Sequence, residues 1–143
     1  MIELVTATEA DFPQVFPLIQ ALWNYNHYEE DATRAVYRQI VTGRESFALI
    51  ARDGGRTLGF CHGDFFPTLW MCGVTCYLSG IITLESERGR GIGSAMIARV
   101  RTLARERGAR AVILDSGLQR TDAHRFYEAR GFVKSCYGFE LAL

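Results

Sequence analysis

The chain has 143 residues with 16 basic and 16 acidic side chains, so its formal net charge is zero. Its length favours a single domain over residues 1–143, and 48% hydrophobic with 22% charged residues is ordinary for a globular protein. This composition excludes a disordered chain, collagen and a coiled coil, and the balanced charge argues against a general nucleic-acid-binding protein.

The first elements along the chain are a strand and two helices. Apolar residues alternate over residues 2–6, which predicts a strand, and then recur at helical spacing over residues 9–23. Thr8 precedes this helix with Asp11 three residues later, an arrangement that resembles a capping box with Asp in place of Glu. A weaker helical pattern covers residues 32–42.

After Gly43 the apolar period changes from that of helices to that of strands. Strands are predicted at residues 47–52 and 57–66, joined by a hairpin turn, and a third lies within residues 70–84. The remaining predicted elements are, in chain order, a helix from residue 92 to Gly108, a buried strand at 111–114, a short helix at 122–130, and one or two final strands within 132–143.

Residues 65–84 carry no charge, a stretch long enough to span a bilayer. Pro67 and two glycines interrupt it, and its β-branched and aromatic residues are typical of buried strands, so no membrane association is expected. Acidic residues among the first eleven argue against a signal peptide, which makes the reducing cytoplasm the expected location. The four cysteines lack metal-ligand spacing, so no metal site is expected.

A glycine-rich turn joins an apolar strand to an amphipathic helix. Its sequence is Arg88-Gly89-Arg90-Gly91-Ile92-Gly93-Ser94. Glycines allow a ligand to approach the backbone closely, and the following helix adds free N–H groups and partial positive charge, so this segment predicts a pyrophosphate cradle. It lacks the lysine of a P-loop and the spacing of the dinucleotide-binding fingerprint, since Lys134 is the only lysine.

Two motifs carry a resemblance to a known family. Arg88, Gly91 and Gly93 match Arg-x-x-Gly-x-Gly, and a second match is Ala123-x-x-Phe126-Tyr127-Glu128-x-x-Gly131-Phe132. Both resemble the GNAT family of N-acetyltransferases, and the order of predicted elements agrees over nearly the whole chain. The resemblance implies an α/β (α+β) GNAT fold, in which about four helices flank a mixed, mostly antiparallel twisted sheet of six to seven strands.

The resemblance also implies acetyl-CoA as cofactor and assigns its contacts. The implied cofactor-binding residues are Ile81, Ile82 and Thr83, whose backbone would pair with the pantetheine arm, and Arg88, Gly89, Arg90, Gly91, Ile92, Gly93 and Ser94 at the pyrophosphate. Tyr127 is the implied acid for the departing thiolate. The base is left open, because residues 74–84 contain no Asp, Glu or His; His62, Asp64, His124 or a water relay are the alternatives.

The acceptor site is expected in the acidic half of the chain. Residues 1–72 contain 5 Arg against 9 Asp and Glu, whereas residues 73–143 contain 10 Arg and one Lys against 7 Asp and Glu. The polar connector between the first two helices offers aromatic and acidic groups that suit a cationic amine, although a solvated loop is the alternative. The candidate acceptor-binding residues are Tyr25, Tyr28, Glu29 and Glu30, with Arg120 as the cation for an anionic substrate group.

Within the family, residues 120–127 and the Phe139-x-Leu141-x-Leu143 ending look most like aminoalkylphosphonate and other small-amine N-acetyltransferases. The predicted function is direct acetyl transfer from acetyl-CoA to a small primary amine in a ternary complex. A non-catalytic acyl-CoA-binding module, an aminoglycoside acetyltransferase and a protein N-terminus or lysine acetyltransferase remain alternatives. No nucleic-acid partner is expected, and a homodimer is left open.

Overall fold

The computed structural model describes residues 1–143 as two compact units, residues 1–113 and residues 114–143. The first unit contains β1 (Ile2–Thr6), α1 (Phe12–Leu22), α2 (Glu30–Thr42), β2 (Ser46–Asp53), β3 (Arg56–Thr68), β4 (Gly73–Thr83), α3 (Ile92–Glu106) and β5 (Val112–Ile113). Two short 3-10 helices, Glu9–Asp11 and Glu85–Glu87, precede α1 and α3. The second unit contains α4 (Thr121–Glu128).

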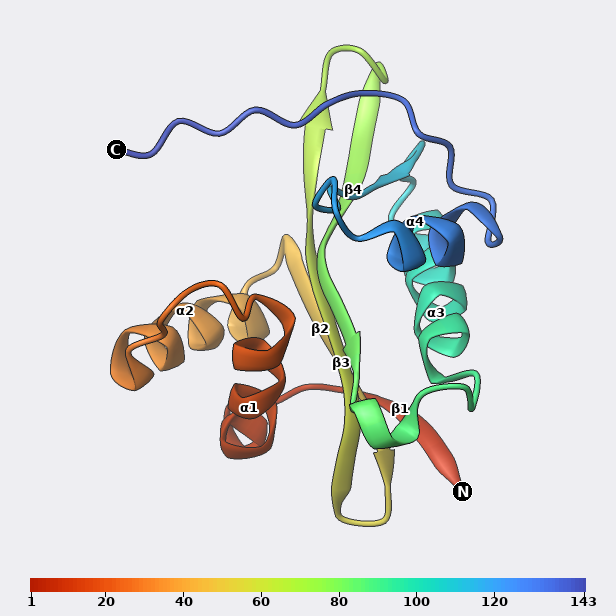
Figure 1. Ribbon diagram of the computed structural model, residues 1–143. Coiled ribbons are helices and arrows are strands. Elements are labelled where there is room, and N and C mark those ends of the chain that lie inside the picture. Colours follow the sequence, from red (N-terminus) through yellow and green to blue (C-terminus); the bar gives the residue numbers. More distant parts are fainter. The chain divides into compact units, whose positions relative to one another are not determined.

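The first unit is built on one mixed sheet whose strands lie in chain order, β1-β2-β3-β4-β5. The first four strands pair antiparallel, and β5 pairs parallel to β4. Helices α1 and α2 cover one face of the sheet and α3 covers the other (Figure 1). The predicted mostly antiparallel mixed sheet with four α-helices is therefore confirmed, and the uncharged stretch at residues 65–84 forms parts of β3 and β4.

The predicted number of strands was wrong, because the sheet has five strands rather than six or seven. Residues 132–143, where one or two strands were predicted, form no strand. The alternating apolar side chains of this segment, Tyr137, Phe139, Leu141 and Leu143, are exposed. Alternating apolar side chains indicate a segment that could lie on a sheet. A strand also needs a neighbouring strand with which its backbone can form hydrogen bonds. That neighbour is not readable from the segment itself.

The core on the α1 and α2 face forms where the apolar stripe of α1 meets the sheet. Phe12, Val15 and Ile19 are buried there with Tyr37 of α2 and Phe60 of β3. The Phe12 ring lies 5.3 Å from that of Tyr37, centroid to centroid. The helical spacing that predicted α1 thus identifies its buried side, as an amphipathic pattern should.

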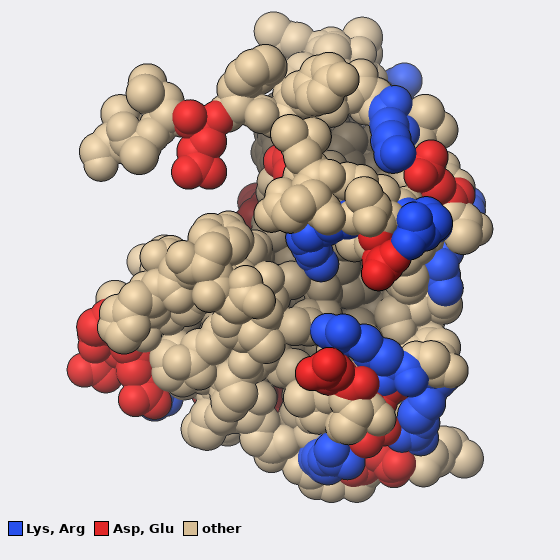
Figure 2. Space-filling view, viewed as in Figure 1, with Lys and Arg blue, Asp and Glu red and all other residues tan.

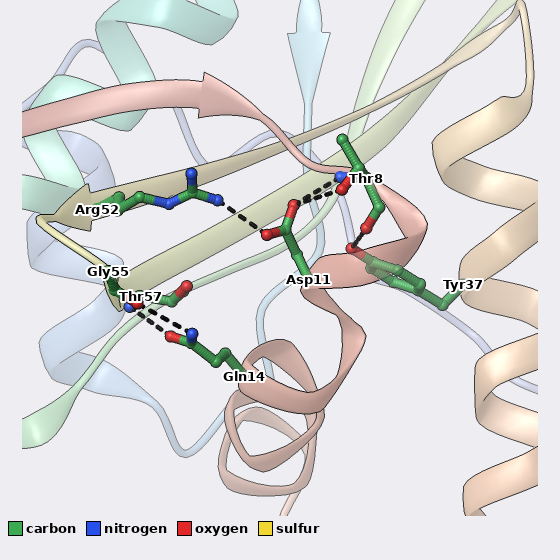
Figure 3. Close-up of polar contacts among 7 residues, drawn as sticks. All are labelled: Thr8, Asp11, Gln14, Tyr37, Arg52, Gly55 and Thr57. Carbon is green, nitrogen blue, oxygen red and sulfur yellow. Dashed lines mark hydrogen bonds and ion pairs between the residues drawn. The ribbon is translucent and has the colours of Figure 1, made fainter.

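Polar contacts fix the start of α1 against the sheet (Figure 3). The Asp11 carboxylate accepts hydrogen bonds from the Thr8 N–H at 2.8 Å and the Thr8 hydroxyl at 3.0 Å, and it pairs with Arg52 of β2 at 2.8 Å. The Gln14 side-chain amide donates to the Gly55 carbonyl at 3.0 Å and accepts from the Thr57 N–H at 2.8 Å. Tyr37 Oη donates to the Thr8 carbonyl at 2.6 Å. The predicted pairing of Thr8 with Asp11 is confirmed.

A β-bulge interrupts the pairing of β3 with β4. His62 pairs with Gly80 and Gly63 pairs with Leu78, so Ser79 is an extra residue on β4. A Cβ atom at Gly80 would lie about 3 Å from Leu22 and Trp23, so glycine allows the Trp23 ring to pack directly on the strand. The bulge therefore lies where the end of α1 meets the sheet.

None of the helices combines the length and the hydrophobicity needed to cross a bilayer.

Candidate active site

The glycine-rich turn ends at the first residue of α3 and has the backbone that its glycines predict. Gly89 and Gly91 have φ angles of +82° and +79°, which favour glycine, and Gly91 caps the helix. The first helical hydrogen bond runs from Ala95 N to Gly91 O at 3.0 Å. The N–H groups of Ile92 and Gly93 therefore have no acceptor within the helix. Apart from the glycine itself and the residues next to it in the chain, no residue comes within 4 Å of a Cβ built at Gly89 or Gly91, so the turn is open on that side.

The two arginines of the turn have different partners. Arg90 forms an ion pair with Glu87, and Arg56 of β3 approaches the other oxygen of the same carboxylate at 3.0 Å. Hydrogen bonding and charge from these arginines lower the pKa of Glu87. Arg88 is exposed and forms no ion pair, and Figure 2 shows acidic and basic side chains side by side in this region. Arg88 is therefore the cation that a ligand could meet without displacing a carboxylate.

The strand before the turn has an unpaired edge. Leu84 N–H donates to Leu58 O, so the backbone groups of Ile82, two residues earlier, also face β3, and those of Ile81 and Thr83 face the opposite side. On that side β5 pairs only with Cys76 and Tyr77 of β4, which leaves Ile81 and Thr83 without a strand partner. Two of the three residues predicted to pair with the pantetheine arm thus have backbone groups at a free edge. The Ile82 side chain packs against the core.

The connector between α1 and α2 was the predicted acceptor site, and the structure gives its side chains local partners. Glu29 caps α2 by accepting from the N–H groups of Asp31 and Ala32 at 3.0 and 2.7 Å, and these hydrogen bonds lower its pKa. Glu30 lies 3.8 Å from an arginine one turn later, and Tyr28 Oη donates to the Trp23 carbonyl at 2.7 Å. Tyr25 is 81% exposed. Figure 2 shows the acidic end of α2 as an outer patch.

His62 and Asp64 lie on β3, close to the bulge. The His62 ring lies between those of Phe60, at 5.5 Å, and Trp23, at 5.9 Å, and its Nδ1 atom has no hydrogen-bond partner. Burial lowers the pKa of His62 to about 4, so its imidazole is neutral near pH 7. Asp64 Oδ2 lies 3.5 Å from the hydroxyl of Ser79, the bulge residue. Sequence reasoning did not find Ser79, because an extra residue in a strand leaves no pattern.

The second unit contains the predicted acid Tyr127. Tyr127 is buried on α4, with its ring 5.5 Å from Phe126 and 5.8 Å from Phe132. Burial raises the pKa of Tyr127, while the nearby Arg120 lowers it, so the phenol keeps its proton at neutral pH. A ring nitrogen of His124 lies 2.9 Å from the Gly117 carbonyl, which makes this histidine part of the local loop structure. The roles of Tyr127 and Arg120 stay predictions.

These features together place an open glycine-rich turn at the start of α3, next to an unpaired edge of β4. The profile of the acetyltransferase (GNAT) family matches residues 11–132. The chain belongs to this family and is an N-acetyltransferase; the family uses acetyl-CoA as its acetyl donor.

The chain is also similar over nearly its whole length to individual proteins of known sequence or structure. The aminoalkylphosphonate N-acetyltransferase of Salmonella typhimurium is 38% identical over 99% of this chain and 91% of its own length. A crystal structure described as a transcriptional regulator from Bacillus halodurans is 27% identical, covers 100% of both chains and has a TM-score of 0.91. AAC(6')-Iy, solved with the bisubstrate analogue CoA-S-monomethyl-acetylneamine, shares the fold at 21% identity and a TM-score of 0.87, over 100% of this chain and 98% of its own.

Proposed function

We propose that this protein transfers the acetyl group of acetyl-CoA directly to the primary amine of a small molecule while both are bound. The main support for this proposal is that two candidate binding features, the strand edge and the glycine-rich turn, follow each other directly in the chain. The unpaired edge at Ile81 and Thr83 leads, over a few residues, into the turn that ends at the start of α3. An extended arm with backbone-like amides followed by a pyrophosphate suits an open edge followed by an anion site.

Each part of the chain has a distinct task in this reaction. The backbone of residues 81 and 83 orients the cofactor arm, and the N–H groups of Ile92 and Gly93 with Arg88 bind the pyrophosphate. When bound, acetyl-CoA supplies a thioester carbonyl that an amine can attack. Tyr127 Oη holds the proton that the departing sulfur needs, because its raised pKa keeps the phenol protonated.

The acceptor that we favour is a small zwitterion with one amine and one anionic group. The 38% identity to an aminoalkylphosphonate N-acetyltransferase extends over nearly the whole chain, which supports this class. Arg120 would pair with the anionic group, and Arg120 forms no ion pair within the protein. An aminoglycoside is the second candidate, because the exposed acidic end of α2 suits a polycation.

The test is acetylation of an amine panel: 2-aminoethylphosphonate, neamine, spermidine and a peptide with a free N-terminus. The acetylated product is measured by mass spectrometry, because the exposed Cys72 and Cys136 would react with a thiol reagent for free CoA. We expect 2-aminoethylphosphonate to be acetylated fastest. Initial rates with both substrates varied should give intersecting lines, whereas parallel lines would indicate an acetyl-enzyme. Calorimetric binding of CoA without acetylation of any amine would favour the binding module instead.

A further inference from the structure

The face of the sheet that carries α1 and α2 continues beyond these helices as a polar and aromatic surface. Side chains two residues apart share a face, so His62, Asp64 and Phe66 of β3 lie on the same side as the core residue Phe60. Across the strand pair, Asp64 lies opposite Tyr77 of β4, whose ring centroid is 6.5 Å from that of Phe66. Asp64 thus shares a face of the sheet with this aromatic pair.

The bulge brings this surface to the cofactor edge. In a regular strand, residues that are an even number of positions apart direct their backbone N–H and C=O groups to the same side. The backbone groups of Cys76 face β5, yet those of Leu84, eight residues later, face β3. The single extra residue Ser79 accounts for this reversal, and the free edge begins two residues later at Ile81. Because the Ser79 hydroxyl also contacts Asp64 at 3.5 Å, the carboxylate lies close to the strand segment assigned to the acetyl-carrying arm.

Among the acidic residues that are at least partly buried, Asp64 differs from the others in its lack of a cation. Three other acidic residues are not fully exposed, namely Asp11, Asp53 and Glu87, and each forms an ion pair with a basic group. Asp64 is half-buried and forms none. A carboxylate that is partly removed from water is stabilised by a positive partner, and aromatic rings beside it favour an organic cation.

We propose that Asp64 binds the acceptor amine in its ammonium form, which then releases a proton to water so that the neutral nitrogen can attack the thioester. Ser79 orients the Asp64 carboxylate, and Phe66 and Tyr77 lie beside the bound cation. The inference rests on the proposed function and narrows its substrate class. One unpaired carboxylate matches one ammonium group, so the acceptor is a compact monoamine rather than a polyamine. The acidic end of α2, which lies on another element, has no part in amine binding.

The experiment compares Asp64→Asn, Ser79→Ala and the control Glu106→Gln, an exposed residue on α3 without an ion pair. The amine that the wild type acetylates fastest in the panel is the probe. Asp64→Asn should raise its KM about 10- to 100-fold, as expected for loss of a charge-assisted contact, and leave the Kd of CoA unchanged. Ser79→Ala should raise the KM less, and Glu106→Gln should leave it unchanged.

Three outcomes would overturn a claim, and one would support the proposal. If the wild type acetylates no amine, the proposed function fails and the role of Asp64 fails with it. If the wild type is active and Asp64→Asn keeps its KM while circular dichroism shows a folded protein, only the role of Asp64 is overturned. If spermidine or neamine, which both carry several amino groups, is the fastest acceptor, the monoamine class is overturned. A folded Asp64→Asn variant with a raised amine KM and an unchanged CoA Kd supports the proposal.

Discussion

Arg88 and Arg90 lie two residues apart in the same turn, but only Arg90 is paired with Glu87. Arg88→Ala should therefore weaken CoA binding by about 1.5–3 kcal/mol, the value of a charge-assisted hydrogen bond. Arg90→Ala should weaken it less, because the pyrophosphate must share that guanidinium with a carboxylate. Calorimetric Kd values for CoA test this order, with Arg99→Ala on the exposed side of α3 as control. Equal losses in both variants would contradict the distinction.

Tyr127 is the predicted acid, so its substitution tests the chemical step separately from cofactor binding. Tyr127→Phe should lower kcat about 10²- to 10⁴-fold, the usual effect of losing a positioned acid, and should leave the Kd of CoA unchanged. Tyr137→Phe is the matched control, since it deletes the same hydroxyl from an exposed tyrosine in the same unit. Near-normal turnover in Tyr127→Phe would make this side chain a packing residue among Phe126 and Phe132.

At the scale of elements, Asp11 joins the start of α1 to β2. Asp11→Ala leaves the Thr8 N–H and the half-buried Arg52 without their shared acceptor, so it should lower the free energy of unfolding by about 1–3 kcal/mol. Urea denaturation measures this change. Glu106→Ala, at an exposed site without an ion pair, should stay within about 0.5 kcal/mol of the wild type. A similarly small change in Asp11→Ala would show that the Asp11 carboxylate is not needed to hold α1 on the sheet.

The sequence predicted the elements that depend on neighbouring residues in the chain. It did not predict the features that depend on residues far away in the chain. The helical spacing of Phe12, Val15 and Ile19, and the glycines of the turn, are read directly from neighbouring residues. The alternation in residues 132–143 is just as regular, but pairing depends on another strand, and none is present. The family motif indicated the turn, whereas the pairing of Arg90 with Glu87 and the bulge at Ser79 arise only from the fold.

At the scale of the whole molecule, one buried histidine links stability to pH. The pKa of His62 is about 4 in the folded protein, below its ordinary value near 6.5, so between these values the unfolded chain binds a proton that the folded chain does not. Stability should therefore fall by about 3 kcal/mol as the pH drops from 6.5 to 4, at about 1.4 kcal/mol per unit of pKa difference. The lowered pKa of Glu87 adds a further loss only near and below its ordinary value of 4.5.

Urea denaturation at pH 7 and pH 4.5 tests the contribution of His62. His62→Leu removes the titrating group, so its stability should depend less steeply on pH over this interval than that of the wild type. His27→Leu, which removes an exposed histidine, is the control. An unchanged pH dependence in His62→Leu would assign the acid sensitivity to other groups.

The unpaired edge at Ile81 and Thr83 also bears on how the protein behaves in concentrated solution. A bare row of strand N–H and C=O groups is a template on which another chain can add, and such addition leads to aggregation. A cofactor arm along that edge would block this route. Light scattering on heating should therefore begin at a lower temperature in the apoprotein than with CoA. Adenosine 3',5'-bisphosphate, which has no pantetheine arm, should protect less than CoA at equal occupancy. The bound cofactor would then keep the enzyme soluble as well as supply its acetyl group.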